Sequence, residues 1–472
     1  MPSRALTDED FRRWRTYAPR VKHIGTHSSA WGRTDPRRCK LDISFYDSLE
    51  LHGVLPINRL TSYTGRDWTD SVTFHRVLSK TTVAVSFSGF YGQTPYFTSP
   101  APLVFTLPHT LRALRFGGDQ RFDLRLFNAT LLTLPHLEVL RCLTSLPVPD
   151  EVLHHILSSA VLLELELGNL PQDFRRCMPS HTPLRLQHFG LRTERLEECP
   201  AVFTSLDTSR LESIKVFYHD RHNHPLAPRD QSFFASLLSC VVLKKIEFIA
   251  PAVLCSFLEV SNINLMTVTP LLKLRDLEEL IITSPTGFIF DNESIKMFAR
   301  SWANMRHLEF NSRYPRWQGV TDYKITLDGL AIIAKSWPNL EHLNICLTAR
   351  GDFENSIKDL ALDVGKLQSC STLRSLGVGL DSPVPYKPLV VAAFLHEIFP
   401  NLSTIQGLER PELPDEWRQI QGRLRHLIGL GKRTLVDTVG VLERATLVSK
   451  QIPLTLEWKE LYDLFRLKGR LP

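Results

Sequence analysis

The chain has 472 residues, of which 43% are hydrophobic, a content that is ordinary for a folded protein and argues against disorder. Its formal net charge is only +6 and its basic residues form no long runs, which argues against nucleic acid as the main ligand. No apolar run approaches the roughly 18 residues of a membrane span, and the N-terminus is too polar for a signal peptide, so we expect a cytoplasmic or nuclear protein without membrane contact.

The N-terminal part, residues 1–106, is predicted to contain one helix and three short strands. Thr7 followed by Asp10 is a typical helix start, and apolar residues at helical spacing predict a helix over Leu6–Ala18, which Pro19 ends. The strands are predicted at Val21–Ile24, Leu60–Tyr63 and Val83–Phe87. Their spacing is uneven, so we expect irregular repeats here.

From residue 107 to residue 410 one short motif recurs, with apolar residues at positions 1, 4 and 6 of a six-residue segment. Its copies are Leu111–Phe116, Leu137–Cys142, Leu162–Leu167, Leu186–Leu191, Leu211–Val216, Leu243–Phe248, Leu277–Ile282, Met305–Phe310, Leu340–Ile345, Leu373–Val378 and a weaker one at Leu402–Ile405. Subtracting the first positions of successive copies gives steps of 24 to 35 residues. These steps lie in or just above the range of leucine-rich repeats.

Each copy predicts a short strand with one buried face. Positions 4 and 6 point to one side of the strand, whereas positions 3 and 5 point to the other side and are mostly polar. Before the copy at Leu340, apolar residues stand at helical spacing over Thr326–Trp337, and a Pro-Asn corner follows. The repeating unit is therefore a helix, a corner and a strand.

An ordinary doubly wound α/β domain is the alternative, because it also alternates helices and parallel strands. Its strands would be nearly continuous apolar runs, since helices cover both faces of its sheet. Here residues such as Arg115, Lys215 and Glu247 stand between the apolar positions, which indicates one sheet face in water. We predict an α/β leucine-rich-repeat solenoid, a horseshoe with a parallel concave sheet and helices on its convex side.

The longest steps between copies contain loops that follow strand ends, such as His219–Pro225 and Asn311–Tyr323. Loops on one rim of a rigid scaffold are common binding sites. Past residue 410 the repeats stop, and residues 411–472 are predicted to form a helical tail that caps the last repeat. Its helices are expected at Asp415–Leu430, Leu435–Val448 and Trp458–Lys468.

Patterns for catalysis or metal binding are weak throughout the chain. The best metal-like stretch, His219–His224, lies in a polar loop without the rigid surroundings that a ligand set needs, and His154–His155 is expected on a helix surface. Gly429–Thr434 resembles a phosphate loop but has Arg433 where a serine or threonine should bind magnesium. We expect no enzyme activity, no cofactor and no metal. The eight cysteines form no C-x-x-C pair and are expected to be reduced thiols, several of them in repeat cores.

Several features resemble the F-box/leucine-rich-repeat proteins of mushroom-forming fungi. They are the opening segment Leu6–Phe11, the Leu-Pro units that begin at Leu107 and Leu134, and Pro400–Leu402 near the end. In such proteins an N-terminal F-box binds the adaptor of a cullin-type ubiquitin ligase, and the repeats bind the substrate. The resemblance therefore implies a substrate-recognition subunit.

This sequence departs from that family at its start. No F-box-like helix precedes Leu6, so we expect either that the F-box was lost or that the gene model is truncated. The internal segment Leu146–Leu157 has a similar pattern, but its place between two strands predicts the helix of a repeat.

The expected function is protein binding without catalysis. The first hypothesis is a substrate-recognition subunit of a cullin-type ubiquitin ligase, or an F-box-less relative of one, and the alternative is a stand-alone scaffold or regulator. A protein substrate is expected on the concave face or on the strand-end loops. A ligase adaptor would be a second partner if an F-box exists upstream.

The candidate binding residues are the outward positions of consecutive strands. They are Arg115, Arg141, Glu166, Lys215, Glu247, Glu309 and Asn344, with His307 and His342 one row over. The charge of this face is expected to change from basic at Arg115 and Arg141 to acidic at Glu247, Glu279 and Glu309. As surface positions, Glu247 and Glu309 are expected to tolerate reversal to lysine together with the melting temperature unchanged within about a degree or two, since surface changes usually cost under about 0.5 kcal/mol.

Overall fold

The computed structural model describes residues 7–25, 61–65, 78, 80–88, 107–117, 124–143, 148–170, 174–178, 185–218, 227–250, 263–284, 287–312, 324–348, 369–379, 388–407 and 415–429. The chain divides into two compact units, Met1–Thr193 with Ala201–Leu211, and Glu194–Pro200 with Glu212–Pro472. This division falls inside residues 107–410, which the sequence predicts to be one array. The predicted boundaries near residues 106 and 410 stay predictions.

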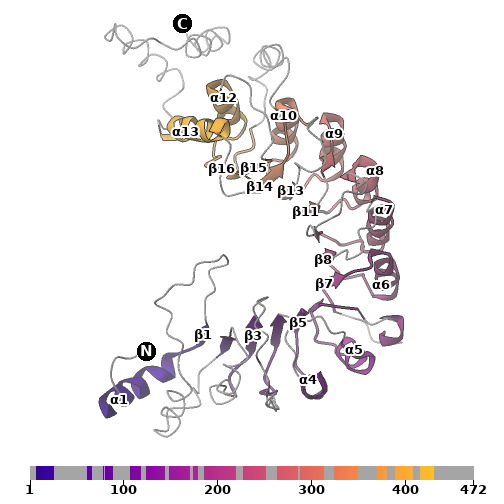
Figure 1. Ribbon diagram of the computed structural model, residues 1–472, viewed down its shortest axis with the longest axis vertical. Coiled ribbons are helices and arrows are strands. Elements are labelled where there is room, and N and C mark those ends of the chain that lie inside the picture. Colours follow the sequence, from indigo (N-terminus) through magenta and orange to yellow (C-terminus); the bar gives the residue numbers. More distant parts are fainter. Residues whose placement is uncertain are drawn as a thin grey trace. The chain divides into compact units, whose positions relative to one another are not determined.

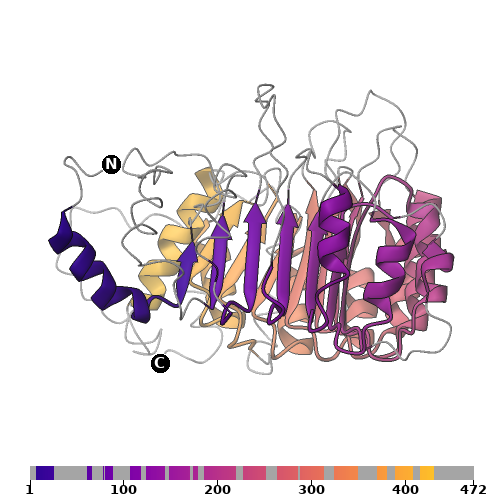
Figure 2. The same cartoon turned by 90° about the horizontal axis from the view of Figure 1, so that it is seen from below.

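The first unit is built on a parallel sheet in which β1 to β7 pair in chain order. The strands are β1 (His23–Gly25), β2 (Ser62–Gly65), β3 (Ala84–Ser88), β4 (Ala113–Gly117), β5 (Val139–Leu143), β6 (Glu164–Leu167) and β7 (His188–Thr193). The helices are α1 (Asp8–Tyr17), η1 (Ala18–Arg20), α4 (Leu124–Leu131), α5 (Asp150–Leu157), η3 (Phe174–Cys177) and most of α6 (Cys199–Ser205). Figure 2 shows these strands side by side and pointing the same way, and α4 and α5 cover one face of the sheet (Figure 1).

The second unit repeats this arrangement with β8, β9, β11, β13, β14, β15 and β16 as successive parallel neighbours. These strands are β8 (Ser213–Tyr218), β9 (Lys245–Ile249), β11 (Glu279–Ser284), β13 (His307–Ser312), β14 (His342–Ile345), β15 (Ser375–Val378) and β16 (Thr404–Gly407). A separate parallel pair consists of β10 (Ile263–Asn264) and β12 (Phe288–Ile289).

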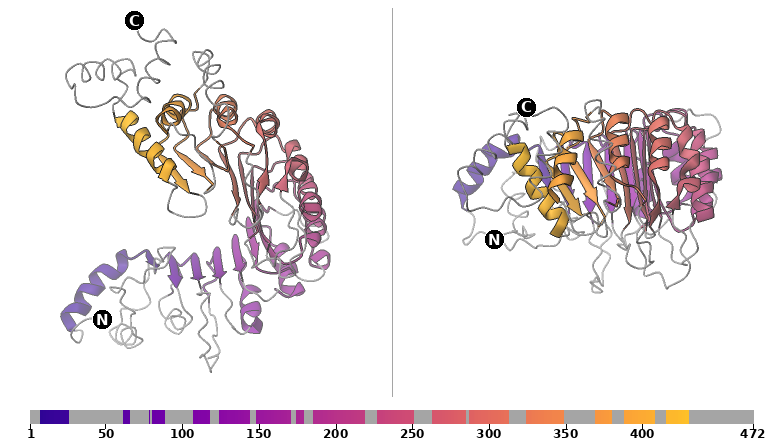
Figure 3. Two further views of the ribbon diagram at one scale, coloured as in Figure 1. Left: turned by 45° about the horizontal axis from the view of Figure 1, so that its top comes forward. Right: turned by 90° about the horizontal axis from the view of Figure 1, so that it is seen from above.

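The helices of the second unit lie between its strands in the chain, except that the first precedes β8 and the last follows β16. They are η4 (Leu196–Glu198), α7 (Ala227–Ser236), η5 (Leu237–Ser239), α8 (Leu265–Val268), η6 (Thr269–Lys273), α9 (Asn292–Ser301), α10 (Leu327–Ser336), α12 (Pro388–Ile398) and α13 (Asp415–Gly429). Helices α7 to α10 lie on one face of the sheet (Figure 1). Helix α13, yellow in Figure 3, packs on α12 and β16 and so covers the last strand.

The register of the strands explains why the apolar positions recur. Position 4 of each copy lies opposite position 4 of the next, as in Leu114 opposite Leu140 and Leu308 opposite Leu343, and all four of these side chains are fully buried. The backbone N–H at position 2 of one repeat donates to the position 2 carbonyl of the repeat before it. Each repeat is thus held to its neighbour by a buried row of leucines and by a ladder of hydrogen bonds, the arrangement of a solenoid.

Cross-repeat hydrogen bonds also hold the helices. Asn292 at the start of α9 accepts from the Thr326 backbone N–H at 3.0 Å and donates to the Thr326 hydroxyl at 2.8 Å. Thr326 in turn caps α10 by accepting from the Asp328 N–H. Farther in, Trp302 stacks on Phe298 with ring centroids 5.0 Å apart, and its indole N–H donates to the Leu271 carbonyl. The caps therefore belong to pairs of repeats rather than to single helices.

The predicted leucine-rich-repeat fold is confirmed. The opening helix, with its Thr7–Asp10 capping box, and the three N-terminal strands lie within two residues of the predicted bounds. The α-helix ends at Tyr17, before Pro19, as predicted, and a separate 3-10 turn, Ala18–Arg20, contains the proline. Leu146–Leu157 contains the repeat helix α5, on which His154 and His155 are exposed, as predicted.

Other predicted features fall outside the described residues. They are the loop His219–Pro225, most of the loop Asn311–Tyr323, the helices at Leu435–Val448 and Trp458–Lys468, and the phosphate-loop-like segment beyond Gly429. The first helix of the predicted tail is α13.

Candidate functional site

The candidate site is the face of each sheet that the helices of the described residues leave uncovered, which we call the open face. It is formed by positions 3 and 5 of the motif, which alternate with the buried positions 4 and 6 along every strand. In β8 and β9 the residues at these outward positions are half-buried, while those between them are buried. Half-burial on a flat sheet leaves side chains within reach of their neighbours on adjacent strands.

In the first unit, position 5 forms the row Arg115, Arg141, Glu166 and Gly190 across β4 to β7. Arg141 forms ion pairs with Glu164 and, at 3.5 Å, with Glu166, which is only 6% exposed. A side chain at Gly190 would place its Cβ 2.4 Å from the Glu166 Cγ, so the glycine makes room for this carboxylate. Arg115 is exposed and forms no ion pair with the described residues.

In the second unit, position 5 begins with an ion pair between Lys215 and Glu247 at 3.1 Å. The Lys215 ammonium also lies 4.7 Å from the centroid of the Phe217 ring, a cation–π distance. Ile281 stands opposite Glu247 on one side and Glu309 on the other. An apolar side chain is thus placed between two carboxylates at the centre of the row.

Glu309 is the slightly more enclosed of the two carboxylates in this row, with 18% of its side chain exposed against 20% for Glu247. The Asn344 side-chain amide donates to its Oε2 at 2.8 Å, the Asn311 amide lies 3.4 Å from its Oε1, and His307 Nε2 lies 3.5 Å from Oε2. Burial by itself would raise the pKa of Glu309, but the hydrogen bonds and the charge of His307 together lower the pKa below its usual value. No lysine or arginine among the described residues forms an ion pair with it.

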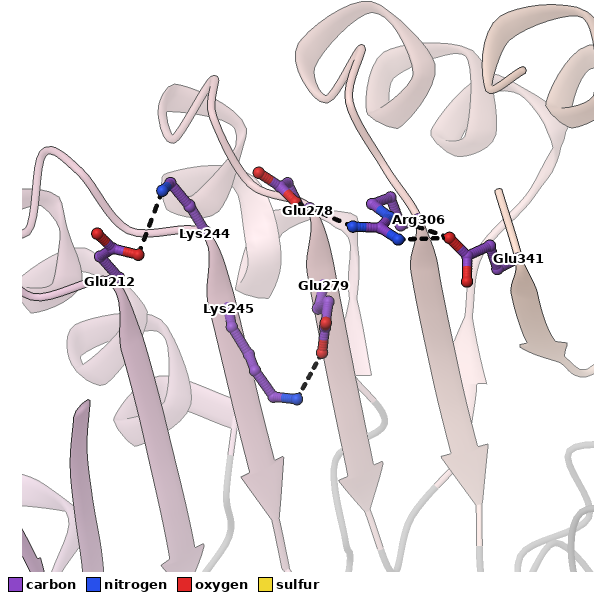
Figure 4. Close-up of polar contacts among 7 residues, drawn as sticks. All are labelled: Glu212, Lys244, Lys245, Glu278, Glu279, Arg306 and Glu341. Atoms are coloured by element: carbon purple, nitrogen blue, oxygen red, sulfur yellow. Dashed lines mark hydrogen bonds and ion pairs between the residues drawn. The ribbon is translucent and has the colours of Figure 1, made fainter. Parts of the chain in front are cut away.

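Position 3 forms a second row on the same face. Lys245 and Glu279 form an ion pair between β9 and β11 (Figure 4). On the next two strands, the rings of His307 and His342 lie 5.1 Å apart, tilted by 42°. The two histidines therefore lie one row over from Glu309 and Asn344, as the sequence predicts.

Position 2, just before each strand, adds a row of charges that the predicted site leaves out. Lys244 pairs with Glu212 at 3.2 Å, and Arg306 lies between Glu278 at 3.9 Å and Glu341 at 2.5 Å (Figure 4). The hydrogen bond from Arg306 lowers the pKa of Glu341. The signal is in the sequence, where position 2 reads Glu212, Lys244, Glu278, Arg306, Glu341, Arg374 in six successive repeats. This alternation places opposite charges on neighbouring repeats.

The structure changes two of the expectations about charge. Cross-strand ion pairs neutralise Arg141, Glu247 and Glu279 locally, so these residues form no simple gradient from basic to acidic. Glu309 is not a fully exposed surface position: 18% of its side chain is exposed, and it accepts from Asn344 on the next strand and from Asn311 on its own strand. Reversing its charge would remove the acceptor to which the Asn344 and Asn311 side-chain amides donate.

Other kinds of site have little support in the described part of the chain. No group of three histidine, cysteine or acidic residues is arranged there to bind a metal. None of its helices has the length and apolar character needed to cross a membrane. Six cysteines of the described residues are buried thiols, and burial raises the pKa of the Cys199 thiol, with a further contribution from Glu198, so this thiol stays protonated and unreactive.

Comparison with known proteins gives little beyond this geometry. No family model matches the sequence, and no curated protein matches it. Among solved structures the chain is similar to the leucine-rich-repeat-containing protein LegL7 from Legionella pneumophila, with 11% identity over 76% of this chain and 98% of that chain, and a TM-score of 0.33. The fold assignment therefore rests on the repeated units themselves, which make this chain a leucine-rich-repeat protein.

Proposed function

We propose that this chain is a non-enzymatic binding protein that holds a protein partner on the open face of its repeats. The observation that carries the proposal is the uncovered row at position 5 of the second unit, where Ile281 and the partly exposed Glu309 lie side by side on a rigid sheet. Polar groups fixed by neighbouring strands lose little freedom when a partner binds, which favours recognition.

A photo-crosslinking experiment tests this proposal. The photoreactive residue p-benzoylphenylalanine replaces His342, which is exposed on the open face, and, as the matched control, Met297, which is 38% exposed on α9. After irradiation in native cell extract, we expect protein adducts of defined mass at position 342 and not at position 297. Identical adducts at both positions, or adducts only at 297, would contradict binding on the open face.

The more specific role is a substrate-recognition subunit of a cullin-type ubiquitin ligase, or an F-box-less relative of one, in the cytoplasm or nucleus. It is supported by the sequence resemblance alone, with a stand-alone scaffold or regulator as the alternative. Mass spectrometry of proteins co-purified with the chain from native cells separates the two. A ligase adaptor and a cullin are expected for the first role, and their absence alongside a stable open-face partner would favour the second.

A further inference from the structure

The charges on the open face of the second unit and on its position 2 row do not cancel completely. Positions 2, 3 and 5 of the copies from Leu211 to Leu402 contain six carboxylates and five cations. The carboxylates are Glu212, Glu247, Glu278, Glu279, Glu309 and Glu341, and the cations are Lys215, Lys244, Lys245, Arg306 and Arg374. The ion pairs already described, with the attraction of Arg374 for Glu341, involve every member of both sets except Glu309.

Glu309 is held ready to accept a donor from outside the chain. Its Oε2 is occupied by Asn344, whereas the nearest donor to its Oε1 is the Asn311 amide at 3.4 Å, a long contact. A carboxylate offers about four acceptor positions, so Oε1 retains unused capacity. Because the local hydrogen bonds lower the pKa of Glu309, the group is an anion at neutral pH. A partly buried anion that has only His307 beside it, and no lysine or arginine of the described residues, interacts more strongly with a cation than an exposed one does.

The residues around Glu309 indicate which kind of cation would bind to it. Ile281 is half-buried and directly opposite Glu309 on the neighbouring strand, so it offers an apolar contact at one strand spacing, about 5 Å. One row over, at position 3, the His307 and His342 rings add flat surfaces. A bare metal ion gains nothing from an isoleucine, whereas an arginine or lysine carries both a cation and an apolar stem.

The geometry points to a basic protein segment as the ligand: an extended stretch of a partner whose arginine or lysine pairs with Glu309 while a neighbouring aliphatic residue packs on Ile281. This inference rests on the proposed function and specifies its partner. The strand spacing of about 5 Å and a rise of roughly 3.4 Å per extended residue place the two side chains within two residues of each other.

The test uses the purified full chain and a phage-displayed library of random dodecapeptides. Selected peptides are expected to contain arginine or lysine within two residues of leucine, isoleucine or valine. Their dissociation constants are then measured by fluorescence anisotropy. Glu309→Gln, which keeps the shape of the side chain and removes its charge, is expected to weaken binding about tenfold or more.

Two further variants make the result specific. Glu293→Gln on α9 also removes one negative charge from the second unit and is expected to change binding less than about twofold, since that carboxylate lies on the helix side and pairs with Lys296. Ile281→Lys places a cation beside Glu309 and is expected to abolish binding of the basic peptides. It serves as a second test should Glu309→Gln fold poorly.

Three outcomes would overturn the inference. They are selection of peptides without basic residues, equal binding by the wild type and Glu309→Gln, and unchanged binding by Ile281→Lys. If position 342 still crosslinks to a partner in any of these cases, the open face remains a binding site and only the basic character of the ligand is wrong. If nothing binds the open face in either experiment, the proposed function fails as well.

Discussion

Glu166 and Glu309 occupy the same position of the repeat, in different units, and both are enclosed, yet they are stabilised in different ways. Glu166 is paired with Arg141 and lies in the space left by Gly190 on the next strand. Glu309 receives amide donors from Asn344 and Asn311 and has His307 beside it, with no lysine or arginine at ion-pair distance in the described residues.

At this one position of the repeat, the difference distinguishes a carboxylate that stabilises the fold from a carboxylate that is available to bind a partner. Glu166 shares Arg141 with Glu164, and a partner would have to compete with this ion-paired cluster in order to use the carboxylate. A carboxylate held by neutral amides keeps its net charge for a ligand. Burial and charge at position 5 therefore do not identify a binding residue until the neighbouring strands are known.

The largest expected effect comes from truncating a core side chain next to Asn344, the residue that donates to Glu309. Leu343 is fully buried on β14, directly before Asn344, and Leu343→Ala should lower the free energy of unfolding by about 2–5 kcal/mol through lost burial and a cavity. In a solenoid the damage should stay local, so amide hydrogen exchange should rise in the described parts of residues 305–378. The repeats that contain Glu166 should keep their protection. Uniform loss of protection over residues 107–406 would show instead that the repeats unfold as one body.

Three groups of positions in the repeat show how much of the fold and of the candidate site could be predicted from the sequence. The leucines at positions 1, 4 and 6 predicted the strands and the core, because burial there depends only on the period of a strand. The outward direction of Glu166 and Glu309 followed from the same period. Their partners did not follow, because whether a carboxylate meets an arginine, an amide or a glycine depends on strand order, register and side-chain direction together. The alternating charges at position 2 were readable in the sequence, but their meaning needed the parallel register.

Whether Glu166 depends on the space beside Gly190 is tested by filling that space. Gly190→Ala would bring a Cβ to 2.4 Å from the Glu166 Cγ and should cost about 1–3 kcal/mol, as overpacking usually does. Thermal denaturation measures the change. The matched control is Gly422→Ala in α13, where nothing lies within 4 Å of the new Cβ and the helix should gain about 0.5–1 kcal/mol. Equal effects of the two variants would mean that Glu166 is not confined by the glycine.

A smaller effect is expected from removing the Asn344 side-chain amide, which donates a hydrogen bond to Glu309. Asn344→Ala removes the 2.8 Å hydrogen bond to Oε2 and should cost roughly 1 kcal/mol in urea unfolding, since Glu309 keeps some contact with water. The same variant should also weaken the binding of the basic peptides, because the Glu309 carboxylate loses its fixed orientation. Unchanged affinity together with lost stability would assign Asn344 to the fold alone.

The smallest expected effect is a pH dependence that separates the charge of Glu309 from its shape. Because the pKa of Glu309 is lowered in the folded chain, the ionised form stabilises the fold above the unfolded glutamate pKa of about 4.3, and this contribution is lost as the pH falls through the folded value. The wild type should therefore lose stability relative to Glu309→Gln as the pH falls from about 5 through the lowered pKa of folded Glu309. Melting temperatures of the two proteins across this range measure the difference. A wild type that gains stability over the variant on acidification would mean that the folded chain prefers Glu309 protonated, in which case it would offer no charge to a basic partner.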